Sequence, residues 1–190
     1  HNVAIARMEL RYDDFQARVV RLDGEVGCKA LEDEDYFLIA LRLERDGGFK
    51  DIPEKLIRNA VGLIAKNQTF DSAKEWARTL PKWDGVPRIE TFYRDYLGAD
   101  DTAYARALGV YQWTGMAGRL MDPGCQLDIT PIWVGAQGCG KTTSVKALSP
   151  SPEYFGPIDL GLKDADFSRK VRGKLIGEIG ELRGMYGRER

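Results

Sequence analysis

Short alternating segments open the chain, and segments with helical spacing follow them. Apolar and polar residues alternate over residues 8–12 and 17–22, which predicts two strands joined as a hairpin across Asp13-Asp14. Residues 33–45 begin with acids, carry apolar residues at helical spacing and end at Asp46-Gly47-Gly48, which predicts a helix. A second helix is predicted to begin at Pro53. Its apolar face would consist of Leu56, Ile57, Ala60, Val61 and Ile64.

A third helix is predicted beyond residue 71, because Ser72 and Glu75 have the spacing of a capping box ahead of Trp76. Residues 1–80 are therefore predicted to form a small, mainly helical α+β domain that contains a β-hairpin. A winged-helix-like module and a packing domain without a ligand both fit this pattern.

Residues 81–90 contain Pro81, Gly85 and Pro87, which mark a boundary or an ordered connection. We expect Trp83 in this connection to pack against a neighbouring element. Residues 100–120 then have the spacing of a long helix, and Asp122-Pro123-Gly124 would end it. The aromatic residues of this helix, such as Tyr104, are expected in the core.

Residues 135–142, Gly-Ala-Gln-Gly-Cys-Gly-Lys-Thr, match the G-x-x-x-x-G-K-[ST] pattern of a phosphate-binding loop. We expect Gly135 and Gly140 to adopt conformations that a Cβ would forbid, so that successive N–H groups face the phosphates. Lys141 would reach the β- and γ-phosphates, and the Thr142 hydroxyl would bind Mg²⁺. The pattern thus predicts a site for a nucleoside triphosphate with Mg²⁺. The alternative is a glycine-rich turn with a solvated lysine.

The residues around this loop agree with the pattern. The apolar run at residues 131–134 predicts a strand before the loop, and residues 142–148 predict a helix after it. The N-terminus of that helix would add its dipole to the binding of an anion. Strand, loop and helix in this order are the context that the motif requires.

A second motif, which contains acidic residues, follows the loop by a few tens of residues. Residues 163–172 predict a helix, and it leads into an apolar segment, residues 174–182, that contains Glu178 and Glu181. An apolar strand that ends in an acid at this distance is typical of the carboxylate that supports Mg²⁺ in such proteins. We expect Glu178 to act on Mg²⁺ and Glu181 to polarise the attacking water. A solvated strand end is the alternative for both residues.

Composition and charge limit the class of protein. The 190 residues carry a formal net charge of −1, which gives no support for a basic nucleic-acid-binding face. No apolar stretch approaches the roughly 20 residues that span a bilayer, and no signal-peptide pattern opens the chain. The three cysteines, Cys28, Cys125 and Cys139, have no regular spacing, which favours a reducing compartment over disulfides or a zinc site. We therefore expect a cytoplasmic protein without a membrane partner.

Several motifs, taken in order, resemble the virulence-associated protein E family of prophages and pathogenicity islands. They are Trp83-Asp84-Gly85-Val86-Pro87-Arg88, the run at residues 95–98, Pro123-Gly124-Cys125, the loop, and residues 175–182. The resemblance implies an α/β P-loop NTPase core, AAA+-like and of the superfamily 3 helicase type, whose N-terminal part is residues 81–190. It also implies an ATP-hydrolysing DNA helicase or translocase that replicates mobile-element DNA as a homo-oligomeric ring, such as a hexamer.

The resemblance places ATP on the loop and the acidic motif on Glu178 and Glu181. The implied nucleotide-binding residues are Gly135, Ala136, Gln137, Gly138, Cys139, Gly140, Lys141, Thr142 and Thr143. Catalysis is implied for Lys141, Glu178 and Glu181, and binding of Mg²⁺ for Thr142 and Glu178.

The sensor residue, arginine finger and pore loops of such ATPases would lie further along than residue 190. We therefore expect a truncated core, part of a longer protein, that binds ATP with little turnover, since a finger is worth ~10³–10⁵ in rate. Two other hypotheses stay open: a nucleotide-dependent switch or interaction module that never unwinds DNA, and a small-molecule kinase.

Overall fold

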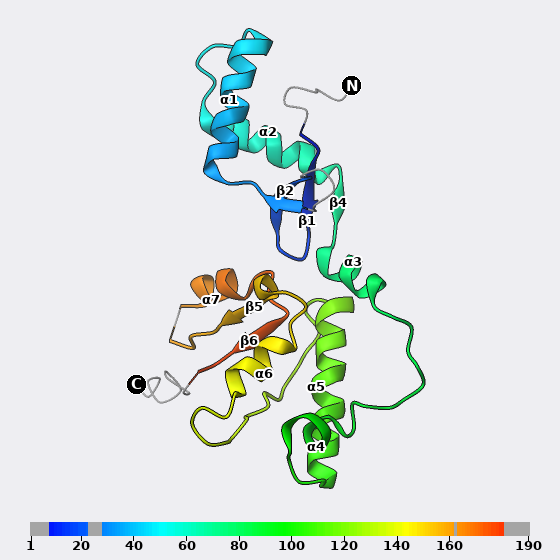
Figure 1. The fold of residues 1–190 in the computed structure, drawn as a ribbon. Helices are drawn as coiled ribbons and strands as arrows, with labels where there is room; N and C mark the ends of the chain where they lie inside the picture. Colours follow the sequence, from blue (N-terminus) through cyan, green and yellow to red (C-terminus); the bar gives the residue numbers. More distant parts are fainter. Residues whose placement is uncertain (1–7, 23–27, 162, 181–190) are drawn as a thin grey trace. The chain divides into compact units, whose positions relative to one another are not determined.

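A computed structural model describes residues 8–22, 28–161 and 163–180 and divides the chain into two compact units (Figure 1). Unit 1 comprises residues 1–75 and unit 2 comprises residues 76–190. The boundary lies within helix α3 (Ser72–Thr79). Among the described residues, no helix is both long and apolar enough to cross a bilayer.

Unit 1 contains a four-stranded sheet in the order β3-β2-β1-β4. Strands β1 (Leu10–Asp13) and β2 (Arg18–Leu22) pair antiparallel, so the predicted hairpin is confirmed. Strand β3 (Cys28–Ala30) extends the antiparallel pairing, and β4 (Thr69–Phe70) runs parallel to β1. Ala17 completes the hairpin turn in a left-handed conformation, with φ of 49°.

Two helices complete unit 1, and both were predicted. Helix α1 (Asp33–Gly47) begins with a capping box between Glu32 and Asp35 and ends at Gly48, whose φ is 68°. Helix α2 (Glu54–Lys66) follows Pro53 and packs against β1 and β2, and α1 packs against α2. The core of the unit contains Ile39 of α1 with Ile57 and Val61 of α2, and strand residues such as Leu10 and Val19 pack against them. Burial of apolar side chains between α1 and α2, and between α2 and the sheet, therefore holds unit 1 together.

Helix α3 is present, but the predicted capping box is wrong. Ser72 is already the first helical residue, and its buried hydroxyl has no hydrogen-bond partner. The cap is Asp71, whose carboxylate accepts from the Lys74 N–H at 2.9 Å. Glu75 instead lies 3.7 Å from Arg11 in an ion pair. The buried Asp13 carboxylate accepts from the backbone N–H of Ser72 at 3.2 Å, which fixes the start of α3 to the hairpin turn.

Unit 2 begins with two packed helices, α4 (Phe92–Leu97) and α5 (Ala103–Met121). The long helix predicted over residues 100–120 is confirmed: Thr102 caps it, and it ends before Asp122. The expectation that Tyr104 lies in the core is wrong, because its side chain is 74% exposed. With 3.6 residues per turn, Tyr104 lies about 180° around the helix from Trp113, whose ring contacts α4.

The rest of unit 2 contains a small parallel sheet with helices beside it. Strands β5 (Phe155–Pro157) and β6 (Ile176–Glu178) pair in parallel, so the strand that ends at Glu178 is confirmed. The predicted helices are also present, as α6 (Lys141–Ala147) after the loop and α7 (Asp164–Val171) before β6. A 3-10 turn, η2 (Pro152–Tyr154), precedes β5.

The strand predicted over residues 131–134 is not formed. These residues pair with no strand within the described parts of the chain, and the Ile132 and Val134 side chains are 64% and 93% exposed. An apolar run becomes a strand only where another strand supplies its backbone hydrogen bonds, and none of the described strands does so for this run. The AAA+-type sheet therefore stays a prediction.

Two helical glycines have opposite expected responses to alanine. A Cβ on Gly109 of α5 would overlap the backbone carbonyl oxygen of Ile89, whereas nothing lies within 4 Å of a Cβ on Gly62 of α2. We expect Gly109→Ala to lower the free energy of unfolding by about 1–3 kcal/mol, because the backbone must shift. Gly62→Ala should raise it by about 0.5–1 kcal/mol through helix propensity. Chemical denaturation of both variants checks this, and equal shifts in one direction would contradict the packing described for α5.

Candidate functional site

The loop at residues 135–142 leads directly into helix α6. Gly138 and Gly140 have φ of 79° and 91°, in the left-handed region that favours glycine, so the expectation for Gly140 is confirmed. For Gly135 the expected reason is wrong, because its φ is not among the positive values. A Cβ there would instead make a tight contact, 3.0 Å from the Cys139 sulfur, which would have to shift slightly.

The Lys141 side chain folds back over this loop. Its ammonium donates to the carbonyl oxygens of Gly135 at 2.8 Å and Ala136 at 2.9 Å, and it lies 3.7 Å from the Cys139 sulfur. An ammonium has three donors, so these contacts use its full capacity within the loop. The loop therefore holds a cation at its centre, where the motif requires one for phosphate.

The hydroxyl of Thr142 donates to a carboxylate oxygen of Glu178 at 2.6 Å. Thr142 is the second residue of α6, and Glu178 is the last residue of β6. The parallel register of β5 and β6 pairs Glu178 with Pro157, and Ile158 donates its N–H to the Glu178 carbonyl at 2.8 Å. The structure thus brings together the two predicted Mg²⁺ ligands, which are 36 residues apart in the chain.

These two oxygen atoms suit a magnesium ion. Mg²⁺ prefers hydroxyl and carboxylate oxygens, and it keeps several waters while it takes the remaining ligands from substrate phosphates. Thr142 and Glu178 would hold such an ion beside Lys141, and all three residues line one cavity of about 850 Å³. The donor set therefore fits the expected metal.

The other predicted site residues have different surroundings. Ala136 accepts from the Cys139 N–H at 3.3 Å, which closes the turn around Gln137. Thr143 lies exposed on α6. Glu181 lies outside the described residues.

The motif at residues 83–88 forms a local loop of its own. The Arg88 guanidinium donates to the Asp84 carboxylate at 2.9 Å, and these bonds lower the pKa of Asp84 below its ordinary value. The Trp83 indole N–H donates to the Val86 carbonyl at 3.2 Å, but the side chain is 77% exposed. The expectation that Trp83 packs against a neighbouring element is therefore wrong.

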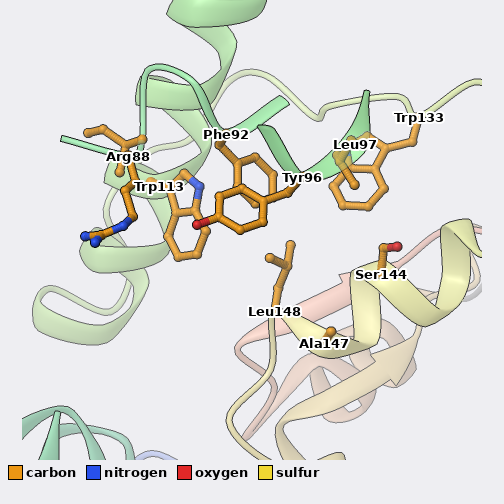
Figure 2. A pocket seen from close by; sticks show the side chains of 10 residues that line it. Arg88, Phe92, Tyr96, Leu97, Trp113, Trp133, Ser144, Ala147 and Leu148 are labelled. Atoms are coloured by element: carbon orange, nitrogen blue, oxygen red, sulfur yellow. The ribbon is translucent and has the colours of Figure 1, made fainter. Parts of the chain in front are cut away.

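A second cavity, which the sequence analysis did not identify, lies beside α6. Figure 2 shows the rings of Phe92, Tyr96 and Trp113 facing Ala147 and Leu148 across a hollow of about 480 Å³. The sequence pattern predicts a core position for the aromatic residues of the helix at residues 100–120 and singles out neither Phe92 nor Tyr96. The available signal was the concentration of aromatic side chains in residues 92–113, ahead of the loop.

A comparison with models of protein families identifies one family. Residues 77–190 match the family model of the virulence-associated protein E-like domain. A search of curated proteins found no match. The matched region includes the phosphate-binding loop and the acidic motif that contains Glu178. Because it covers more than half of the chain, the chain belongs to the virulence-associated protein E-like family.

Proposed function

We propose that unit 2 binds Mg·ATP on the loop at residues 135–142 and belongs to an ATP-hydrolysing protein. The observation that carries this proposal is the hydrogen bond between Thr142 and Glu178, at 2.6 Å. It brings the hydroxyl of the loop motif and the acid of the second motif to one point beside Lys141. A glycine-rich turn with a solvated lysine gives no reason for this pairing.

The roles of the residues follow from their positions. The Lys141 ammonium would exchange its bonds to the Gly135 and Ala136 carbonyls for phosphate oxygens. Thr142 and Glu178 would orient the metal. When bound, Mg²⁺ neutralises charge on the β- and γ-phosphates, which is the main need in phosphoryl transfer. Glu181 stays the predicted residue for polarising water.

Replacement of Lys141 tests the phosphate site. We expect Lys141→Ala to weaken binding of Mg·ATP by roughly 10–150-fold, because a charge-assisted hydrogen bond contributes ~1.5–3 kcal/mol. Isothermal titration calorimetry of the wild type and the variant measures the change. Lys146→Ala is the matched control, since it removes an exposed lysine from the same helix without touching the loop. Equal losses in the two variants would point to bulk charge rather than to a site.

Replacement of Thr142 tests the metal. We expect Thr142→Val to reduce the gain in ATP affinity that Mg²⁺ provides, because the hydroxyl ligand is lost while the side-chain volume is kept. Thr142→Ser retains the hydroxyl and should keep most of that gain. Titrations of ATP with Mg²⁺ and with EDTA give the two affinities for each variant. A full magnesium effect in Thr142→Val would exclude Thr142 as a ligand.

The proposal extends to DNA through the family resemblance to superfamily 3 helicases. In this proposal the partner of the ATPase is DNA, and the ATPase assembles as a homo-oligomeric ring. We expect single-stranded DNA to stimulate ATP turnover by a longer protein that contains this chain together with the sensor, arginine finger and pore loops. Steady-state turnover with and without DNA measures this. Nucleotide-dependent oligomerisation without a response to DNA would favour the switch instead.

A further inference from the structure

One wall of the hollow beside α6 carries aromatic side chains from α4 and α5. Phe92 lies between two other rings: the centroid of its ring is 5.6 Å from the centroid of Tyr96 and 5.3 Å from that of Trp113. Trp133 lines the same hollow from the segment ahead of the loop (Figure 2). Phe92 is buried, whereas Tyr96 is 62% exposed, so that part of the aromatic surface faces open space.

The opposite wall of the hollow belongs to the helix that follows the phosphate loop. Ser144, Ala147 and Leu148 line it, and they follow Lys141 by three to seven residues. A helix rises by 1.5 Å per residue, so this wall begins roughly 5 Å and ends roughly 10 Å beyond Lys141. A nucleotide whose phosphates lie on the loop can extend over that distance.

The chemistry of the hollow suits a nucleotide base. Bases stack on aromatic rings, and each such contact is worth ~1–3 kcal/mol when it is measured by alanine substitution. The volume of about 480 Å³ lies within the range of small-molecule sites. Arg88 also lines the hollow, and its guanidinium is paired with Asp84. A purine has the larger stacking face of the two base classes.

We propose that this hollow holds the purine base of the nucleoside triphosphate, with Tyr96 as a stacking residue. The inference rests on the proposed binding of Mg·ATP by the loop. It assigns stacking of the base to aromatic residues ahead of the loop, opposite the wall from α6, and recognition of the phosphates to the loop itself. The two parts of one ligand would thus be bound by separate groups of residues.

The experiment compares Mg·ATP with magnesium tripolyphosphate, which has the phosphates but no base. We expect Tyr96→Ala to weaken Mg·ATP by roughly 5–150-fold and to leave tripolyphosphate unchanged. Tyr104→Ala is the matched control, because it removes an exposed tyrosine of α5 that does not line the hollow. Calorimetric titration of both ligands into the three proteins gives the affinities.

A second variant acts from the other wall without removing a ring. Ala147 is exposed on α6, and Ala147→Phe should fill the hollow and selectively weaken Mg·ATP. If wild-type protein binds both ligands and neither Tyr96→Ala nor Ala147→Phe changes the affinity for Mg·ATP relative to tripolyphosphate, the base site is wrong and the phosphate site stands. If wild-type protein binds neither ligand, the proposed function fails and the base site fails with it.

Discussion

The hydrogen bond from Thr142 to Glu178 joins the two halves of the proposed site. One partner is fixed by helix α6, which begins where the left-handed Gly140 ends the loop. The other is fixed by β6, whose register against β5 holds the backbone of Glu178 through Ile158. Since both ends are tied to regular elements, the hydroxyl and carboxylate oxygens lie together before any ligand arrives. Such preorganisation reduces the cost of ordering side chains on binding.

Aromatic contacts, rather than a sheet, fix the segment that leads into the loop. Trp133 donates its indole N–H to the Tyr93 hydroxyl at 3.4 Å, and the two rings meet edge to face. Tyr93 also donates to Gln112 of α5, and burial raises the pKa of Tyr93 above its ordinary value. The loop is therefore connected to α4 and α5 through side chains, and these same helices form the aromatic hollow.

The tryptophan motif that first indicated the family has a structural role that its letters do not reveal. Asp84 binds Arg88 within the motif, so the segment keeps its shape without support from a core. Arg88 then lines the hollow beside Phe92. A short local pattern thus contributes one residue to a surface that also includes residues of α5 and α6.

The sequence by itself determined the local features: the hairpin, helices α1, α2, α5 and α6, the loop, and the acid at the end of β6. Each depends on spacing, turn residues or caps within a few positions. Only the tertiary structure decided that Thr142 meets Glu178, that residues 131–134 stay unpaired, and that rings from α4 and α5 face α6. These features depend on which distant segments pack together, and no local pattern encodes that choice. A contact between distant segments also acts at Ser72: its backbone N–H donates to the Asp13 carboxylate, and Asp71 caps α3 instead.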